Sequence, residues 1–350
     1  MPGLGVPQLE TILPDKIKRN YGQWIAHESP KPGVLKHIAE SGEELVSIRA
    51  GTPGNARLSV STVRQLANLA DKYSGGHVRI TQRKSWEFVD VAPEQVDALI
   101  ADLKALGFPV GGTNRTFRNV FACTGWLHCQ FAATDAPGLA QVISDNLFEY
   151  FVEDKLPAQL KVSVSGCVNN CGNAMTADIG LVGIHRDIPR VDDAGVAKCE
   201  IPLIISICPV GAIKPKAPKS IEIDQERCIH CPACSAQCSA VHIGNAETDG
   251  VAIFVGGKAA NTGNGPSLAK LAVPYLPNNT PRWHEVTAAV RKIVETWAAG
   301  AKQDERIGEW IERIGWEKLF QRTGFPMTFK HVDGFVMGSR AARANVRFRW

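Results

Sequence analysis

The spacing of apolar residues in the first third of the chain predicts alternating strands and helices. In residues 61–74 apolar side chains recur every three or four positions, which predicts a helix with Ser61 as its N-terminal cap. Residues 44–50 and 78–91 are predicted to be strands, and 92–107 a second helix, with a proline in its first turn and a glycine at its end. The predicted order of strand, helix, strand and helix is an α+β pattern.

A second α+β region is predicted further along the chain. Its strongest element is an amphipathic helix at 138–154, followed by strands at 160–166 and 177–184. Two more helices are predicted near the C-terminus, at 283–299 and 303–320. The fold class predicted from these patterns is therefore α+β throughout.

Composition narrows the class of protein. The 350 residues are 44% hydrophobic and 21% charged, which is enough to bury a core and to form two or three domains. Lysine plus arginine (39) exceeds aspartate plus glutamate (35) by only four, so the charge does not indicate nucleic-acid binding. The first residues, MPGLGVPQLETILPDK, lack the pattern of a signal peptide, and no window approaches the length of a membrane span. We therefore predict a cytoplasmic protein with no membrane span.

The chain contains ten cysteines. Because structural disulfides are rare in the reduced cytosol, metal binding is the leading interpretation of these residues. Nine of the cysteines fall into two sets, and Cys199 stands alone. The first set is Cys123, Cys129, Cys167 and Cys171, and the second is Cys208, Cys228, Cys231, Cys234 and Cys238.

The second set lies in a cysteine-dense stretch that also contains the proline- and lysine-rich KPKAPKS. Its motif is CIHCPACSAQC, preceded by CPVGAI, and it presents thiolates at i, i+3 and i+6 to three corners of an iron cubane. In bacterial two-cluster ferredoxins the fourth cysteine of such a run binds the other cluster. We therefore predict a 4Fe-4S cluster on Cys208, Cys228, Cys231 and Cys234. The alternative is a zinc knuckle, and Cys199 and Cys238 are interpreted as buried thiols.

The first set contains C-x5-C in NVFACTGWLHCQ and C-x3-C in SGCVNNCGNA. Together these motifs resemble the signature of sirohaem sulfite and nitrite reductases. The resemblance implies that all four thiolates hold a second 4Fe-4S cluster and that Cys171 also bridges to the sirohaem iron. Asn169, Asn170 and Asn173 could donate hydrogen bonds to this cluster. For either pair alone, a metal-free loop is the alternative.

Sirohaem carries many carboxylates and sulfite is an anion, so such a site needs concentrated positive charge. In VRITQRKSW the residues Arg79, Thr81 and Arg83 alternate, and on a single strand they would share one face. They resemble the R-x-T-x-R strand of the sirohaem reductases. Lys84 completes this basic stretch.

Other cations match the same family in position. Arg118 in FRNVFAC and Lys161 in LPAQLKVSVSGC resemble an arginine and an active-site lysine of the family, whereas Gln159 stands where the other lysine would be. Lys258, in the glycine-rich loop VGGKAANTGNGP, could also bind carboxylates. Taken singly, each of these cations is more often a solvated surface charge, and it is their matching positions that favour a binding role.

The resemblance extends to the β-subunit family of the dissimilatory sulfite reductases over nearly the whole chain. It is carried by RNYGQWIAHESPKPGVL, GFPVGGT, ATDAPG, GVAIFVGGK, PNNTPRW and ERIGEWIERIGWEKLF. Two departures matter: Gly166 precedes Cys167 where sulfate reducers have a double cysteine, and Cys123 is an additional ligand. The first cluster therefore still has four cysteine ligands. This shifted pattern could mark an enzyme of a sulfur oxidiser that acts in the oxidative direction.

The resemblance implies four domains. Residues 1–108 would form an N-terminal arm and a ferredoxin-like α+β half-domain, and 109–204 with 246–335 the sirohaem and 4Fe-4S domain. Residues 205–245 would form an inserted ferredoxin domain, and 336–350 a basic C-terminal arm for docking.

It also implies partners. These are an α subunit in an α2β2 complex, a small sulfur-carrier protein with a C-terminal cysteine, an electron donor or acceptor protein, and sulfite itself. In that assembly Arg83, Arg118, Gln159 and Lys161 would face the sirohaem ligated by α. Two alternatives stay open: a non-catalytic iron-sulfur subunit without sirohaem, and a monomeric sirohaem nitrite or assimilatory sulfite reductase.

Overall fold

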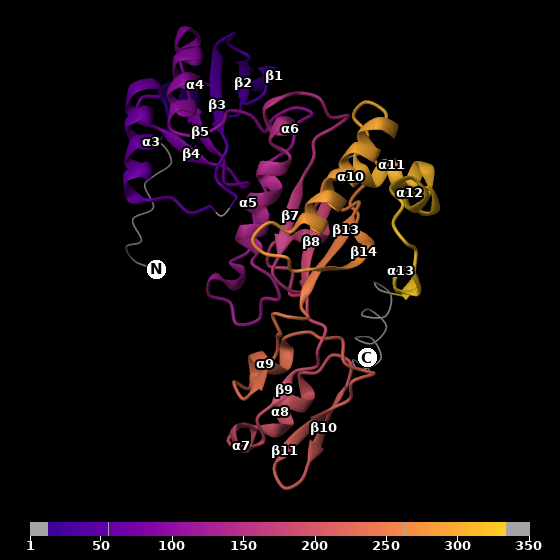
Figure 1. Cartoon of the computed structure of the whole chain (residues 1–350). Helices are drawn as coiled ribbons and strands as arrows, with labels where there is room; N and C mark the ends of the chain where they lie inside the picture. Colours follow the sequence, from indigo (N-terminus) through magenta and orange to yellow (C-terminus); the bar gives the residue numbers. More distant parts are fainter. Residues whose placement is uncertain (1–12, 55, 262, 334–350) are drawn as a thin grey trace, which may run out of the picture. The chain divides into compact units, whose positions relative to one another are not determined.

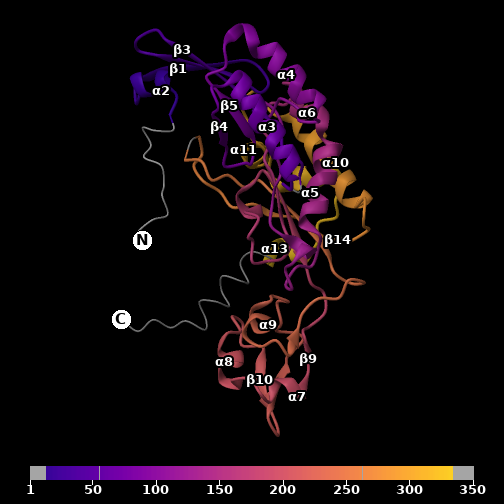
Figure 2. The same cartoon turned by 90° about the vertical axis from the view of Figure 1, so that its left-hand side faces the viewer.

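The computed structural model describes residues 13–54, 56–261 and 263–333. The chain divides into two compact units. The first takes the residues up to Asn119 together with Leu147–Leu160, and the second takes Val120–Asn146 and the chain from Lys161 on. Figures 1 and 2 show the elements of both units along the chain. The basic arm predicted at 336–350 lies outside the described residues.

The first unit is built on an antiparallel sheet with the strand order β1-β2-β3-β5-β4. Its strands are β1 (Trp24–Lys31), β2 (Val34–Ala39), β3 (Glu44–Ala50), β4 (Val78–Ile80) and β5 (Trp86–Val89). The predicted strand at 44–50 is confirmed at both ends as β3. Two short helices also belong to this unit, α2 (Asp15–Arg19) and α6 (Phe148–Val152).

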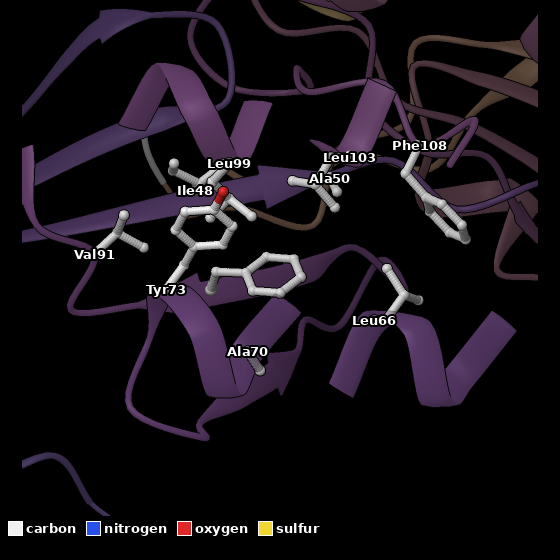
Figure 3. Close-up of a cluster of buried hydrophobic side chains, with 10 residues drawn as sticks. Ile48, Ala50, Leu66, Ala70, Tyr73, Val91, Leu99, Leu103 and Phe108 are labelled. Atoms are coloured by element: carbon white, nitrogen blue, oxygen red, sulfur yellow. The ribbon is translucent and has the colours of Figure 1, made fainter. Parts of the chain in front are cut away.

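Two longer helices, α3 (Val60–Tyr73) and α4 (Val96–Ala105), share a core with this sheet; the short 3-10 helix η1 (Pro93–Gln95) precedes α4. Figure 3 shows Ile48 of β3 beside Leu99 of α4, and Leu66 of α3 in the same cluster; all three side chains are fully buried. The predicted cap of α3 is wrong: the helix begins earlier, and the hydroxyl of Ser59, not Ser61, accepts the main-chain N–H of Thr62.

Residues 78–91 do not form the single strand that was predicted. The chain turns after Ile80, where the Thr81 N–H donates to the Ser85 carbonyl at 2.9 Å, and it returns as β5. Lys84 has a φ of 65°, a left-handed conformation that cannot continue a strand. Because alternation holds only along an extended chain, Arg79, Thr81 and Arg83 do not share a strand face, and that part of the prediction is wrong.

The second unit contains a mixed sheet in the order β14-β13-β8-β7-β6. Its strands are β6 (Phe121–Ala122), β7 (Val162–Ser165), β8 (Ile179–Ile184), β13 (Gly250–Val255) and β14 (Lys270–Pro277). β6, β7 and β8 run parallel, and β13 and β14 pair antiparallel with their neighbours. The predicted strands at 160–166 and 177–184 are confirmed as β7 and β8, each slightly shorter.

Helices α5 (Ala136–Asn146), α10 (His284–Gly300) and α13 (Phe329–Asp333) pack against this sheet (Figures 1 and 2). The helices α11 (Ile307–Ile314) and α12 (Trp316–Thr323) pack on α10. Two predicted helices are interrupted. The one at 138–154 breaks at Leu147, whose backbone leaves the helical region, and the one at 303–320 breaks at Gly315, where φ is 90°. Within the described residues, no helix combines the length and the apolar character needed to cross a membrane.

A cysteine-rich insert connects β8 to β13 and forms the lower lobe in Figure 1. Its elements are β9 (Arg190–Val191), α7 (Asp193–Val196), α8 (Ile201–Ser206), β10 (Ile213–Lys216), β11 (Ser220–Ile223), α9 (Ala233–Gln237) and β12 (Val241–His242). β9 pairs with β12, and β10 with β11. The insert has its own small core, which includes Val196, Ile204 and Ile221.

Cys199 and Cys238 belong to this small core, and a disulfide joins them. The interpretation of these two residues as free buried thiols is therefore wrong. The pairing of β9 with β12 brings together the segments before and after the insert core, so two cysteines 39 positions apart become neighbours.

Candidate functional site

The first cysteine set gathers at one edge of the second unit's sheet. Because β6 and β7 are parallel neighbours, with Ala122 opposite Val164, the segments that follow them leave the sheet at the same edge. Ligands of α/β sheets commonly bind at the carboxyl ends of such strands. The four thiols follow these two strands, Cys123 and Cys129 after β6, and Cys167 and Cys171 after β7.

Glycines make this close approach possible. Gly125, in the short 3-10 helix η2 (Gly125–Leu127), has a φ of 55°, and a Cβ there would lie 2.5 Å from the main-chain nitrogen of Ala136. A Cβ at Gly172, directly after Cys171, would collide with the carbonyl of Val164 in β7. Side chains at these two positions would push the cysteine loops apart.

The four thiols affect one another electrostatically. The pKa of Cys167 is raised to about 11, chiefly by burial. The other three thiols of the set add to the rise, and the main-chain N–H of Asn169 opposes it by donating to the sulfur. The Gly166 N–H donates to the sulfur of Cys123 at 3.0 Å. A buried thiol with a raised pKa, such as Cys167, deprotonates readily only beside a strong positive charge, and iron supplies one.

The asparagines of this loop shape its backbone. Asn170 and Asn173 both adopt left-handed conformations, with φ of 57° and 54°, which asparagine tolerates better than most residues. The Asn170 side-chain oxygen accepts hydrogen bonds from the Ser165 hydroxyl at 3.2 Å and from the Met175 N–H at 3.3 Å, at the start of the 3-10 helix η3 (Ala174–Thr176). These bonds close the loop that presents Cys167 and Cys171.

The second cysteine set surrounds a cavity in the insert. The cavity is small, about 20 Å³, and Cys208, Cys228, Cys231 and Cys234 all line it, together with apolar side chains such as Ile213 and Ile223. Burial is the largest cause that raises the pKa of Cys228, of Cys231 and of Cys234, the last to about 11. The predicted set is therefore brought together, and Cys238 points elsewhere, into its disulfide.

Main-chain N–H groups point at the sulfurs of this second set as well. The Ala212 N–H donates to Cys208 at 3.2 Å, and the His230 N–H donates to Cys228 at 3.4 Å. Such bonds stabilise thiolates and tune cluster potentials. Within the described residues, no three His, Cys, Asp or Glu side chains are arranged to hold one metal ion. A cubane does not need such an arrangement, because each thiolate binds a different iron. Both sets therefore fit a four-iron cluster by ligand type and number.

The predicted basic residues of the VRITQRKSW stretch lie in the first unit. Arg79, on β4, has a largely exposed side chain that pairs with the buried carboxylate of Glu87. Arg83, in the turn, donates to the main-chain carbonyl of Asn119 at 3.0 Å. Thr81 accepts the Ser85 N–H through its hydroxyl at 3.0 Å, which closes the turn in which Lys84 lies.

Arg118 belongs to the same unit. It donates to the Thr116 hydroxyl at 2.8 Å and to the Asn114 carbonyl at 2.8 Å. Gln159 also lies in the first unit, whereas Lys161 and Lys258 lie in the second. Lys258 is buried, and its ammonium group pairs with Glu309 at 2.6 Å.

Sequence reasoning missed two buried polar clusters in the second unit. His185 lies between Asp249, at 2.8 Å from Nδ1, and the Phe131 carbonyl, at 3.1 Å from Nε2. Asp178 receives a two-point ion pair from Arg306. In each cluster the interacting residues are far apart in the sequence, so no local sequence pattern could have predicted the contact.

Comparison with protein families agrees with this site. The model of the nitrite and sulphite reductase 4Fe-4S domain matches residues 113–330, and that of the nitrite/sulfite reductase ferredoxin-like half domain matches 37–106. The fold and the cysteine sets therefore define a nitrite or sulfite reductase with a 4Fe-4S domain, and the predicted fold class is confirmed.

Individual relatives narrow the family. The β subunit of dissimilatory-type sulfite reductase from Archaeoglobus fulgidus is 40% identical, over 99% of this chain and 97% of its own length. The α subunit from Allochromatium vinosum is 25% identical, over 84% of this chain and 73% of its own. A crystal structure of dissimilatory sulfite reductase I shares the fold, with a TM-score of 0.84 at 21% identity over 93% of this chain and 82% of that chain. The chain belongs to the family of dissimilatory-type sulfite reductase β subunits, as its sequence resemblance predicted.

Proposed function

We propose that this chain, together with an α subunit, catalyses the six-electron interconversion of sulfite and sulfide, or carrier-bound sulfur. The observation that carries the proposal is the presence of two complete sets of four cysteines in one unit of a chain from this family. One set suits a catalytic cluster beside sirohaem, and the other suits a cluster that relays electrons. A subunit that only transferred electrons would need no site for the macrocycle.

When bound, sirohaem and its cluster would supply an iron that takes sulfite through sulfur and a store of single electrons. The chain's own contribution begins with Cys123, Cys129, Cys167 and Cys171. Cys171 is the exposed thiol of the four, whereas Cys123 and Cys129 are partly buried and Cys167 is buried. In line with the family pattern, Cys171 would therefore be the ligand available to both the cluster and the sirohaem.

Asn169, Asn170 and Asn173 would fix the orientation of these thiolates. The Asn169 N–H already donates to Cys167, and the left-handed Asn170 and Asn173 hold the loop that carries both cysteines. Preorganised N–H donors lower the negative charge on thiolate sulfur and so raise the potential of a cluster.

The second cluster would bind Cys208, Cys228, Cys231 and Cys234 in the insert. Its apolar lining excludes water from most of the cavity, and the main-chain donors to Cys208 and Cys228 compensate part of the thiolate charge. This set would receive electrons from, or deliver them to, a separate redox protein.

The cations would bind anions. We propose that Arg79, Thr81, Arg83, Lys84 and Arg118 bind sirohaem carboxylates or the substrate, because guanidinium and ammonium groups recognise carboxylate and sulfite oxygens. In an α2β2 complex, Arg83, Arg118, Gln159 and Lys161 would face the sirohaem ligated by α. Gln159 carries no charge there, so that site would polarise sulfite less strongly. Lys258 would have to leave Glu309 before it could bind a carboxylate.

The partners follow from the family. We propose an α2β2 complex, since α subunits are relatives of this chain, and a small sulfur-carrier protein with a C-terminal cysteine as the acceptor or donor of sulfur. The cytoplasmic location and the oxidative direction of turnover stay predictions. Assays of the purified complex with sulfite and with sulfide, at matched driving potentials, would measure the direction.

The experiment that tests the proposal is an absorption spectrum of the acid-acetone extract of the co-purified complex, with iron and acid-labile sulfide counted on the same sample. We expect sirohaem and, for each β chain, about eight iron atoms in two cubanes. Clusters without sirohaem or its metal-free precursor would instead identify an electron-transfer subunit. Half of that iron would show that only one cysteine set binds a cluster.

A further inference from the structure

The insert is joined to the sheet by a narrow neck. We define the neck as residues 185–187, where the chain leaves β8, and 245–249, where it returns to β13. Figure 1 shows these segments as the connection between the sheet and the lower lobe of the same unit. The neck therefore determines where the second cysteine set lies relative to the first.

Two carboxylates clamp the neck. Asp249 accepts a hydrogen bond from the main-chain N–H of Asn245 at 3.0 Å and pairs with His185 at 2.8 Å. Asp187, on the opposite segment and exposed, accepts from the Asn245 side chain at 2.6 Å and from the Thr248 hydroxyl at 2.8 Å. Both carboxylates thus join the outgoing segment to the returning one.

Only the His185 clamp also reaches the first cysteine set. Its Nε2 lies 3.1 Å from the carbonyl of Phe131, two residues after Cys129. The side chains of His185 and Asp249 are each only 2% exposed, so these bonds are shielded from water. Both ring nitrogens of His185 therefore lie within hydrogen-bonding distance of an oxygen atom.

The neighbouring cavity shows why this contact matters. A cavity of about 550 Å³ is lined by Val168 from the first cysteine loop and by Ile229 and His230 from the second, and His185 lies in its wall. The loops therefore face a common space.

We propose that His185 is a positioning residue that fixes the second cluster relative to the first, and thereby sets the rate of electron passage between them. The inference rests on the proposed function, because it assumes that both cysteine sets hold clusters. The physical reason is that the buried ring of His185 connects the neck of the insert to the Cys129 segment. Asp187 connects only the two segments of the neck to each other. Such supporting contacts orient metal ligands without touching the metal.

The test uses the intact complex and three variants. H185F keeps a ring but removes both hydrogen bonds; H185Q keeps one amide donor; D187N weakens the neck without touching the Cys129 segment. The measurements are the rate of electron equilibration between the clusters after rapid reduction, and the spin coupling between the reduced clusters. Iron and sulfide are counted on each sample.

We expect H185F to slow equilibration roughly tenfold and to weaken the spin coupling. H185Q should be intermediate, because its amide can replace one of the two ring contacts, and D187N should match the wild type. If H185F loses its clusters, H185Q at full iron content must still be slower. An unchanged rate and coupling in both His185 variants at full iron content would overturn the inference, as would an equal loss in D187N. Fewer than two clusters in the wild type would instead refute the proposed function.

Discussion

Asp178 and Arg306 lie 128 positions apart and form a buried two-point ion pair. Arg306 donates from Nε to Oδ1 at 2.9 Å and from Nη2 to Oδ2 at 2.7 Å. Asp178 also accepts the main-chain N–H of Lys161, at the start of β7, at 2.8 Å. Arg306 is the residue before α11, where its own N–H donates to Glu309 at 3.0 Å. The Asp178 carboxylate thus connects the N-terminal end of α11 to β7, the strand that precedes Cys167.

Replacing Arg306 with methionine should be strongly destabilising. The side chains of Arg306 and Asp178 are 7% and 1% exposed, so the variant would leave a buried carboxylate without its counter-charge. We expect the free energy of unfolding of the cofactor-free chain to fall by about 3–5 kcal/mol, measured by urea denaturation. The exposed pair of Arg291 and Glu295 provides the control, and E295Q should change stability by less than about 0.5 kcal/mol. Equal effects of the two variants would show that the buried pair has no special role.

Glu87 predicts how the first unit responds to acid. Its carboxylate is 4% exposed and accepts hydrogen bonds from Arg49, at 2.6 Å, and from Arg79. Burial alone would raise its pKa, but the two arginines outweigh burial, and the pKa of Glu87 is lowered. Because the folded pKa lies below the unfolded value of 4.5, the stabilisation is fully present above that value and is lost as pH falls through the folded pKa.

We therefore expect E87Q to be less stable than the wild type at neutral pH and to lose less stability between about pH 5 and pH 3. Thermal midpoints of the first unit at several pH values would measure both effects. E94Q, at an exposed position beside α4, serves as the matched control and should keep the wild-type slope. Parallel pH profiles for E87Q and the wild type would contradict this account.

The sequence predicted well those features that depend on local spacing. The strand at 44–50 was right because most of its residues are apolar. Cys208, Cys228, Cys231 and Cys234 were grouped by the ferredoxin spacing, whereas the two pairs of the first set were joined by the family resemblance, and Cys238 was wrongly placed in the second set. The single strand at 78–91 was wrong because one left-handed residue, Lys84, turns the chain, and the sequence offers no glycine there to signal it. The helix predicted at 303–320 included Gly315, although a glycine commonly marks the end of a helix.

Long-range pairs could not be predicted. His185 and Asp249 are 64 positions apart, and each is an ordinary residue in its own segment. The Cys199–Cys238 disulfide was missed for the same reason. In addition, Cys238 is the fourth cysteine of a ferredoxin motif, where it would bind a second cluster, but the sequence lacks the remaining ligands of that cluster. Such pairs are set by how β8, β13 and the insert fold together, which no spacing along the chain records.

Replacing Cys123 with serine tests the additional ligand of the first set. A serine hydroxyl is a much poorer ligand for iron than a thiolate, so the first cluster and its sirohaem should be lost. The matched variant is C208S, which should lose the second cluster and retain sirohaem. Each variant should keep about four of the roughly eight cluster iron atoms per chain, and C208S should keep the sirohaem iron as well. The two variants should lose different features of the visible and spin-resonance spectra. Unchanged iron content and spectra in C123S would contradict the assignment of Cys123.

The disulfide between Cys199 and Cys238 should stabilise the insert. It closes a loop of 39 positions around the insert core, and the chain-entropy model gives about 4 kcal/mol for a loop of that length. We expect the C199S/C238S double variant, or a thiol-reduced sample, to show faster amide hydrogen exchange in α7, α8 and α9, while the sheet of the same unit is unaffected. Alkylation under denaturing conditions after cluster removal checks the bond directly. The eight free cysteines should react at once and the remaining two only after reduction, whereas ten reactive thiols before reduction would show that the pair is not bonded.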